Sequence, residues 1–430
     1  MKVAVAGLWH LGAVTAACLA AAGHDVVGFD HDAAVVGRLA EGRAPLFEPG
    51  LDDLLAEGLQ ARRLRFTTDP GLLAAADVVW ITYDTPVDDH DRADVEAVVA
   101  HVQSLFPFVQ DGALVVVSSQ VPVGTTARLE RGFADVADGR AVEFAYSPEN
   151  LRLGQAIERF TRPDRVVVGV RGPRARDVAS ALLAPITDRV EWMSVESAEM
   201  TKHALNAFLA TSVTFINEIA ALCEQTGADA ADVARGLKSE SRIGPRAYLG
   251  PGAAFAGGTL ARDLTFLSAL GRAHGRTTPL LDAVTTSNDA HRAWAQERLS
   301  ALLGRIEDAR VGIWGLTYTP GTDTLRRSSA IELCTWLAGR GAHVQAHDPA
   351  VRTLPAGLEA SIDLKATAID AVRDTAALVV CTAWPEYRQV SALDVIAGMS
   401  RPLILDANRA LADTLAVPGV EYISVGRAVA

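Results

Sequence analysis

Lys202 and Asn206 are the first residues whose types and spacing suggest chemistry. They lie four positions apart in the stretch ESAEMTKHALNAFLATSVTFINEIAALCEQTG, whose apolar residues recur at helical spacing. Residues four apart share one face of a helix, so an ammonium group and a side-chain amide can both point at one oxygen. Such a pair could stabilise an oxygen that becomes negatively charged during a reaction. The alternative is an ordinary solvated helix face.

A second candidate is the turn GLWHLG, between a Val-rich strand and a helix near the N-terminus. The dinucleotide fingerprint G-x-G-x-x-G would need a middle glycine, but the chain has Gly7 and Gly12 with Trp9 between them. We expect the indole to crowd or tilt the approach of a pyrophosphate. Asp30 ends the next strand, where an acid takes the adenosine ribose hydroxyls and favours NAD over NADP. Because folds without a dinucleotide also have such turns, this segment alone leaves cofactor binding open.

A third candidate is AFAGGTLARD, residues 254–263, which reads like a tight glycine turn that delivers a reactive group. Its reactive position holds Thr259. An aliphatic hydroxyl is far less acidic than a thiol, whose pKa is about 8.5, so Thr259 needs a strong base before it can attack. The four cysteines are widely spaced, without a CxxC pair, and we expect small buried side chains in a reducing compartment rather than a metal site or disulfides.

The composition restricts the class of protein. With 430 residues, 49% of them apolar and 21% charged, the chain is long enough for two or three domains and is globular. A net charge of −12 argues against nucleic acid or an anionic membrane as the main partner, although one basic pocket suffices for a polyanionic small molecule. We see no secretory signal in MKVAVAGLWHLG and no apolar run of the ~20 residues that a membrane span needs. We therefore expect a soluble, cytoplasmic protein.

The elements that position these candidates follow from the pattern of apolar residues. Val-rich runs (KVAVAG, DVVGFD, DVVWITY, ALVVVSS, RVVVGV) alternate with amphipathic stretches over the first part, and strand–helix alternation returns after TTSNDAHRAW. The predicted fold class is α/β, with two Rossmann-like doubly wound parallel-sheet domains, 1–190 and 293–430. A long central helix and helical connector, 191–292, join them. So long a helix often forms an oligomer contact.

A series of ordered stretches carries a resemblance to a known family. They are GHDVVGFD, FEPGLDDLL, SSQVPVGTT, SPENLRLGQAI, RPDRVVVG, AEMTKHALNAFLATSVTFINEIA, SRIGPRAYLGPG, GLTYTPGTDTLRRSSA and TAWPEYR. Along nearly its whole length the chain resembles the UDP-glucose / GDP-mannose dehydrogenase family, and RIGPRAYL resembles the UDP-glucose branch more. Family members oxidise the C6 alcohol of a nucleotide sugar with two NAD+. The first hydride transfer gives an aldehyde, a cysteine traps it, a second hydride leaves, and water releases the thioester as an acid.

The resemblance implies roles for individual residues. Lys202 and Asn206 match the pair that stabilises the alkoxide or oxyanion at C6. Asp263 matches an aspartate that partners this lysine and a water, and Glu149 matches a glutamate that assists proton transfer. Further substrate contacts are implied for Leu151, Arg152, Leu153, Arg242, Tyr248, Leu249, Gly252 and Thr319. Cofactor contacts with NAD are implied for Gly7, Leu11, Gly12, Asp30, Thr85, Gln120, Arg262 and Arg326. The alternative for each arginine is a surface ion pair.

The family pattern also implies partners. The expected substrate is a UDP-sugar, as in polysaccharide biosynthesis, and the base meets the chain near Tyr248. Arg242 is expected to reach the sugar of a neighbouring subunit, so a homodimer is the smallest assembly.

The departures from the family pattern concentrate on one half of the reaction. Thr259 stands where the family has its catalytic cysteine, Gln120 replaces a threonine that helps hold the catalytic water, and Leu153 replaces a second glutamate. Thr319 replaces a substrate-contacting lysine, and DANR, residues 406–409, differs from the family's D-G-R-N. The first three serve the step from aldehyde to acid, whereas the groups that polarise the alcohol remain.

Three functions stay open, and we favour the first. The first is an oxidoreductase that stops at the aldehyde or its hydrate, or that returns the hydride in a redox-neutral epimerisation, because a C6 aldehyde acidifies the C5 proton. The second is a conventional UDP-glucose 6-dehydrogenase in which Thr259 or a water takes the part of the thiol. The third is a catalytically silent nucleotide-sugar-binding relative.

Overall fold

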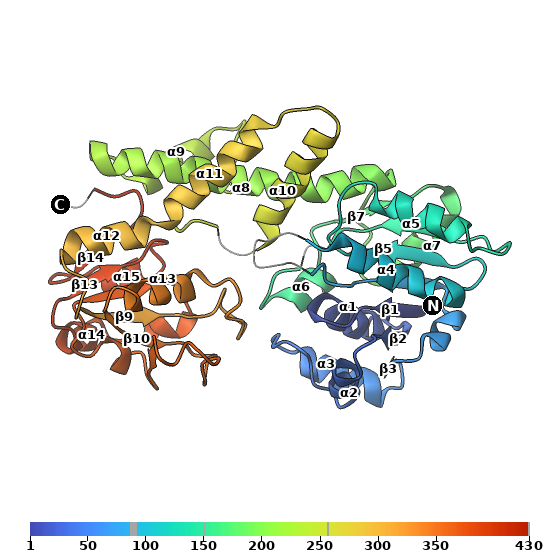
Figure 1. The fold of residues 1–430 in the computed structure, drawn as a ribbon, viewed down its shortest axis with the longest axis horizontal. Coiled ribbons are helices and arrows are strands. Elements are labelled where there is room, and N and C mark those ends of the chain that lie inside the picture. The colour runs from blue at the N-terminus through green and yellow to red at the C-terminus, as the bar shows by residue number, and fades with distance from the viewer. Residues whose placement is uncertain (87–92, 150, 256–257, 429–430) are drawn as a thin grey trace. The chain divides into compact units, whose positions relative to one another are not determined.

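The computed structural model describes residues 1–86, 93–149, 151–255 and 258–428. The chain divides into two compact units, Met1–Ala204 and Leu205–Ala430. The boundary falls inside the longest helix, α8, Val195–Thr226. Figure 1 shows one sheet in each unit, with helices packed around it. The division into domains 1–190, 191–292 and 293–430 stays a prediction.

The first unit contains an eight-stranded sheet in the order β3-β2-β1-β4-β5-β6-β7-β8. All neighbouring strands are parallel except β6 and β7, which are antiparallel. The strand order reverses next to β1, and ligands of doubly wound sheets bind at such a point, outside the carboxyl ends of the strands. The strands are β1 Lys2–Ala6, β2 Asp25–Phe29, β3 Leu64–Thr67, β4 Val78–Ile81, β5 Leu114–Val117, β6 Glu143–Tyr146, β7 Val166–Gly169 and β8 Val190–Met193.

Both faces of this sheet are buried. In β1, Val3 and Val5 point into one apolar cluster, which includes α1 and α7, while Ala4 and Ala6 point into another, which includes α4 and α5. Burial on both sides explains why these strands read as continuous apolar runs. The helices are α1 His10–Ala21, α2 Ala33–Ala40, α3 Leu51–Gln60, α4 Val95–Leu105, α5 Thr125–Ala134, α6 Ala156–Thr161 and α7 Pro173–Leu183, with short 3₁₀ turns η1 Pro70–Ala75 and η2 Phe106–Phe108.

The second unit contains the rest of α8, further helices and a six-stranded parallel sheet in the order β11-β10-β9-β12-β13-β14. Its strands are β9 Arg310–Trp314, β10 His343–His347, β11 Asp363–Leu364, β12 Ala377–Val380, β13 Leu403–Leu405 and β14 Glu421–Ile423. Its helices are α9 Ala230–Ser239, α10 Gly258–Ala273, α11 Pro279–Arg292, α12 Trp294–Leu303, α13 Ser329–Ala338, α14 Ala392–Gly398 and α15 Ala412–Leu415, with 3₁₀ turns η3 Asp370–Val372 and η4 Pro385–Gln389. Arg409 forms an ion pair at 2.7 Å with Asp229, the N-cap residue of α9, and so links this sheet to that helix.

Helix α8 contains 32 residues. Among the described residues it is the one helix long and apolar enough to cross a membrane, with a mean hydropathy of 1.4 over its most apolar window. It nevertheless carries the fully buried Glu199, whose carboxylate accepts hydrogen bonds from the backbone N–H groups of Gly124 and Thr126 at 2.6 and 2.9 Å. Glu199 thereby satisfies orphan N–H groups at the start of α5, as expected of a helix packed inside a protein.

The predicted fold class is confirmed. Every Val-rich run that predicts a strand contains one, and the expected central helix is α8. The strands β3, β6, β8, β11 and β14, which are short or mixed in composition, were not predicted, and neither was the antiparallel pairing of β7.

Candidate active site

The turn after β1 has the backbone that a dinucleotide site requires. Gly7 has φ +95°, and a Cβ there would lie 2.6 Å from the backbone nitrogen of Tyr83. A Cβ on Gly12 would lie 1.8 Å from the carbonyl oxygen of Gly7, so both positions exclude a side chain. Trp9 is 41% exposed, so it is not buried within the turn.

Asp30 lies directly beside this turn. Its Oδ2 accepts a hydrogen bond from Leu8 N at 2.6 Å, and its Oδ1 accepts one from Asp32 N at 3.0 Å. The glycine cradle, the N-terminus of α1 and this carboxylate are the parts with which doubly wound domains hold NAD. The residues present therefore fit that cofactor. On the neighbouring loops, Thr85 Oγ1 donates to the carbonyl oxygen of Gln120 at 2.7 Å, which joins two further candidate positions.

Lys202 and Glu149 form a close ion pair within the first unit. The Lys202 Nζ lies 3.1 Å from Glu149 Oε1 and donates to the Glu149 carbonyl oxygen at 2.6 Å. The Lys202 side chain is only 6% exposed, which excludes the solvated helix face. Glu149 Oε2 accepts from Leu151 N at 2.8 Å, so the carboxylate is fixed from two sides.

Asn206 lies one turn further along α8, in the second unit. Asn206 is buried, and its Nδ2 donates a hydrogen bond to Oδ2 of Asp263 on α10. Asp263 is itself fully buried. Asp263 thereby fixes the orientation of the amide, which has a second N–H for another acceptor. The solvated-face alternative is excluded for Asn206 as well.

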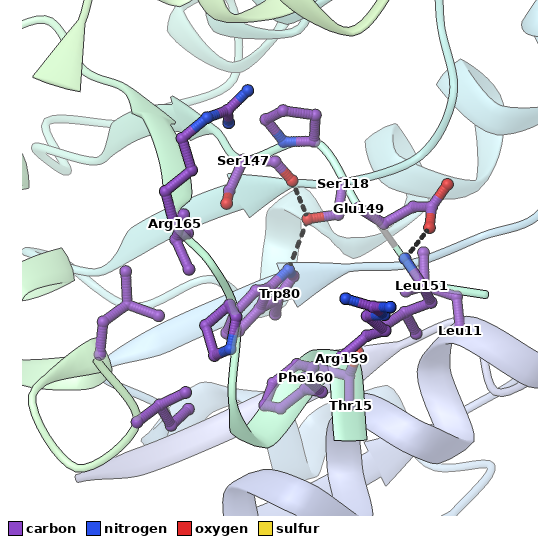
Figure 2. A pocket seen from close by; sticks show the side chains of 15 residues that line it. Leu11, Thr15, Trp80, Ser118, Ser147, Glu149, Leu151, Arg159, Phe160 and Arg165 are labelled. Carbon is purple, nitrogen blue, oxygen red and sulfur yellow. Dashed lines mark hydrogen bonds between the residues drawn. The ribbon is translucent and has the colours of Figure 1, made fainter. Parts of the chain in front are cut away.

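A cavity of about 70 Å³ adjoins Glu149 in the first unit. It brings candidates for both ligands together, because Leu11 of α1, a predicted cofactor residue, lines it alongside Glu149 and Leu151, which are predicted substrate residues. Figure 2 shows the buried polar chain in its wall, in which Trp80 Nε1 donates to Ser118 Oγ at 2.7 Å and Ser118 Oγ donates to the Ser147 carbonyl oxygen at 2.5 Å.

Thr259 is the second residue of α10 and is exposed within its unit. Beside it, Gly258 is buried under the guanidinium of Arg327, since a Cβ on Gly258 would overlap the Arg327 Nη1 at 1.3 Å. Gly258 thus admits a positively charged group against the N-terminus of α10. Arg262 lies in the next turn and is half-buried, whereas Arg326 is exposed.

The remaining substrate candidates are spread over the second unit, apart from Arg152 and Leu153. Arg242 is 87% exposed at its side chain and pairs with Glu240 at 3.0 Å, so the surface ion pair proposed as its alternative is present. Tyr248 is exposed and Leu249 is buried. Gly252 N donates to Asn217 Oδ1 at 3.0 Å. Thr319 is half-buried, as is Leu153 of the first unit, whereas Arg152 of the first unit is exposed.

Several residues that position these segments were missed by sequence reasoning. In the first unit Glu48, nearly fully buried, accepts hydrogen bonds from His10 Nε2 at 2.9 Å, Gly154 N at 2.9 Å and Ala156 N at 2.8 Å. Burial alone would raise the pKa of Glu48, but these hydrogen bonds lower it below its usual value. Glu48 thereby joins the start of α1 to the segment that follows Glu149. Glu48 lies in the family-like stretch FEPGLDDLL, but that stretch does not indicate which residues bind the Glu48 carboxylate.

A set of amides holds the segment that leads to Thr259. Asn288 binds both backbone groups of Phe255, with Phe255 N donating at 3.0 Å and the Phe255 carbonyl oxygen accepting at 3.1 Å. Ala253 N donates to Asn408 Oδ1 at 3.0 Å, and Asn408 belongs to the DANR stretch. Apart from that stretch, nothing in the sequence pointed to these side chains.

Comparisons with known proteins match this architecture domain by domain. Models of the UDP-glucose/GDP-mannose dehydrogenase family match as the NAD binding domain over residues 1–187, the central domain over 196–290 and the UDP binding domain over 312–413. The chain belongs to the UDP-glucose/GDP-mannose dehydrogenase family. The family is one of NAD-dependent nucleotide-sugar dehydrogenases, so the protein is an enzyme of this kind and NAD is its cofactor.

Named relatives cover nearly the whole chain. A UDP-glucose 6-dehydrogenase of Rhizobium meliloti (strain 1021) is 36% identical over 436 residues, 99% of this chain and 100% of the relative. A UDP-glucose 6-dehydrogenase of Pseudomonas aeruginosa is 36% identical over 443 residues, 99% of this chain and 98% of the relative. The solved structure of a UDP-glucose dehydrogenase from Pyrobaculum islandicum has a TM-score of 0.88 at 30% identity, covering 99% of this chain and 98% of that one.

The four cysteines of this family member lie away from Thr259 in the sequence. Cys18, Cys223 and Cys334 are buried and Cys381 is half-buried, all as free thiols. Burial, with a smaller contribution from nearby acids, raises the pKa of Cys18 and of Cys381 to about 12, and burial raises that of Cys334 well above its usual value. Those three thiols are therefore not poised as nucleophiles. Within the described residues no group of three or more His, Cys, Asp or Glu side chains could hold a metal ion.

Proposed function

We propose that this protein oxidises the C6 alcohol of a UDP-sugar and does not carry out the thioester half of the family reaction. The product is then the C6 aldehyde or its hydrate, or an epimerised sugar when the hydride is returned. The observation that carries the proposal is Thr259 at the start of α10. The four cysteines lie elsewhere in the sequence, and the pKa is raised for the thiols of three of them, Cys18, Cys334 and Cys381.

The first half-reaction has its groups in place. NAD, when bound, accepts the hydride from C6. Glu149 takes the proton of the C6 hydroxyl, and the Lys202 ammonium, held at 3.1 Å from that carboxylate, stabilises the negative oxygen. Asn206, one turn from Lys202 on the same helix and fixed by Asp263, keeps a second amide N–H for a substrate oxygen. The helix itself sets the spacing of Lys202 and Asn206.

The second half-reaction lacks its nucleophile. Covalent capture of an aldehyde needs a group that is deprotonated, or easily deprotonated, next to C6. Thr259 offers an aliphatic hydroxyl, which stays protonated at neutral pH. Gln120 and Leu153, at positions where the family holds water and a second carboxylate, remove further parts of the same step.

A redox-neutral outcome follows from the same groups. Once C6 is an aldehyde, the C5–H bond is acidified, and a base can remove that proton and return it to the opposite face. Return of the hydride to C6 then restores the alcohol, so that no net oxidation occurs. Glu149 first passes the proton of the C6 hydroxyl to solvent, and its regenerated carboxylate, held by the ion pair with Lys202, is then the base that removes the C5 proton.

The second candidate function is a full UDP-glucose 6-dehydrogenase that gives UDP-glucuronate. The relatives at 36% identity carry that name and are covered almost end to end. In that case Thr259 or a water must take the place of the thiol.

The product distinguishes these functions. Enzyme, excess NAD+ and a panel of UDP-, GDP- and dTDP-sugars are incubated in D2O, NADH is followed by absorbance, and the sugars are analysed by mass spectrometry. One NADH per sugar with an aldehyde or hydrate, or deuterium at C5 without net NADH, supports the proposal. Two NADH per sugar with a carboxylate refutes it. Thr259→Ala is the matched variant, since its NADH yield and product should equal those of the wild type under the proposal and fall if Thr259 is the nucleophile.

We further propose that the protein works as a homodimer in the cytoplasm. Helix α8 exposes Phe208 at 69%, Phe215 at 46% and Leu222 at 63%, at heptad spacing along one face. A second copy of the helix is a partner with matching chemistry, and such large exposed apolar side chains in a row indicate an interface. The free thiols fit a reducing compartment.

A further inference from the structure

The hydroxyl of Tyr83 is a buried polar group that no atom of the described residues satisfies. Tyr83 follows β4 at the carboxyl edge of the first unit's sheet and is 7% exposed. Its Oη is buried and has no hydrogen-bond partner among the described residues. A buried donor without a partner destabilises a fold, so its retention calls for a group that satisfies it in another state of the protein.

The ring of Tyr83 packs against the dinucleotide turn. A Cβ on Gly7 would lie 2.7 Å from Tyr83 Cδ1, which shows how closely the ring covers the turn. Burial raises the pKa of the Tyr83 hydroxyl, and the nearby negative charge of Asp30 raises it further. The group is therefore a neutral hydrogen-bond donor at physiological pH, close to the carboxylate expected to hold a ribose.

Two exposed imidazoles complete an aromatic cluster around this ring. His31 follows Asp30, and its ring is stacked with that of Tyr83 at a centroid distance of 6.3 Å and an interplanar angle of 13°. His101 of α4 lies 5.0 Å from the Tyr83 ring and 5.2 Å from that of His31. The cluster spans the ends of β2 and β4, on either side of β1 in the sheet. Flat rings at this crevice offer a stacking surface for a planar base.

We propose that Tyr83, with His31 and His101, forms the wall that holds the adenosine half of NAD, and that the Tyr83 hydroxyl donates a hydrogen bond to a ribose oxygen. Asp30 accepts from a ribose hydroxyl beside it. The inference rests on the NAD binding of this domain and is independent of how far the sugar is oxidised. It also explains the orphan hydroxyl, because the cofactor supplies the missing acceptor.

The proposal predicts that removing the Tyr83 hydroxyl has opposite effects on the stability of the ligand-free protein and on its affinity for NAD+. Tyr83→Phe removes the hydroxyl and keeps the ring. Without ligand the variant should unfold at the same or a higher temperature, because a buried unsatisfied donor is gone. Its affinity for NAD+ should fall about five- to tenfold, because the bound state loses one hydrogen bond. A purely structural hydroxyl would not give both effects.

Calorimetric titration with NAD+ and with ADP, together with thermal unfolding of the ligand-free protein, tests this. ADP contains the adenosine ribose but no nicotinamide half, so the same five- to tenfold loss is expected for both ligands. A loss for NAD+ alone would place the contact on the other half and overturn the assignment. Unchanged affinity for both ligands, or lower thermal stability of the variant, would also overturn it.

The matched control is Thr214→Val. Thr214 Oγ1, on α8 in the second unit, is likewise buried and lacks a hydrogen-bond partner among the described residues. Its removal should raise the unfolding temperature and leave the affinities for NAD+ and for ADP unchanged.

The stacking surface is tested with two variants of His101. His101→Ala should weaken ADP binding several-fold, whereas His101→Phe, which keeps an aromatic ring, should retain it. Equal binding by the two variants would contradict the role of the ring.

Discussion

Replacing Lys202 by methionine tests the ion pair on which the proposed chemistry depends. The substitution removes the ammonium and keeps a stem of similar length in a site where the lysine is 6% exposed. Glu149 then loses a partner at 3.1 Å, but it keeps the hydrogen bond from Leu151 N and is 23% exposed, so water replaces part of the interaction. We expect a loss of about 1–3 kcal/mol in the free energy of unfolding, less than the 3–5 kcal/mol typical of a fully buried broken pair.

The effect on chemistry should be larger than that on stability. Loss of one donor to a developing oxyanion lowers the rate about 10²–10³-fold, which corresponds to about 2.7–4 kcal/mol of transition-state stabilisation. Single-turnover formation of NADH from a UDP-sugar measures this first hydride transfer, and urea unfolding measures stability.

The double variant Lys202→Met/Glu149→Gln separates the two effects. It removes both charges, so stability should return toward that of the wild type, while the rate should stay low because neither donor nor base is present. A Lys202→Met enzyme that keeps its fold and transfers the first hydride within about fivefold of the wild-type rate would refute the assignment of Lys202 to the oxyanion.

Further predictions concern the nucleophile, the interface and a buried acid. In Thr259→Cys the new thiol should trap the aldehyde, and the adduct should then pass one further hydride to a second NAD+. The resulting thioester should accumulate and be detected as an increase in intact protein mass, because Gln120 and Leu153 do not support its hydrolysis. Rapid release of the acid would contradict this. Phe215→Glu should convert a dimer to a monomer in light scattering, whereas an unchanged mass would exclude the α8 interface. Glu48→Gln should destabilise the protein by about 1–2 kcal/mol at pH 7. Since the folded pKa of Glu48 is lowered from 4.5, this stabilisation is present above 4.5 and is lost as pH falls through the folded value, so urea unfolding of the two proteins should converge in acid.

The sequence predicted the elements with strong local signals. The strands β1, β2, β4 and β5 have apolar side chains on both faces, and α8 has a long helical period, so short windows of sequence suffice to recognise them. The antiparallel β7 and the short β11 depend on where the chain returns to the sheet, which local pattern does not encode. Topology was therefore less predictable than element type.

The same distinction applies to the site. The spacing of Lys202 and Asn206 on one helix was visible in the sequence, but their burial depends on Glu149 and Asp263, which lie 53 and 57 positions away. Glu48 is further still, since it binds backbone groups 106 and 108 positions along the chain. A carboxylate that serves main-chain N–H groups leaves no side-chain pattern at its partners, so sequence alone does not reveal it.

The surroundings of Thr259 bear on the proposal that this residue stands in place of the family's nucleophile. The guanidinium of Arg327 lies against Gly258, and the N-terminus of α10 adds the positive end of a helix dipole. Both would lower the pKa of a thiol at position 259 and so favour a thiolate. An alcohol gains little from the same field, because its pKa lies too far above neutrality. The electrostatic setting beside residue 259 thus favours a nucleophilic anion, and the identity of residue 259 decides whether an anion forms. For this reason Thr259→Cys should form its covalent adduct at neutral pH, and a cysteine at 259 that titrates above pH 8.5 would show that Arg327 and the helix dipole do not act there.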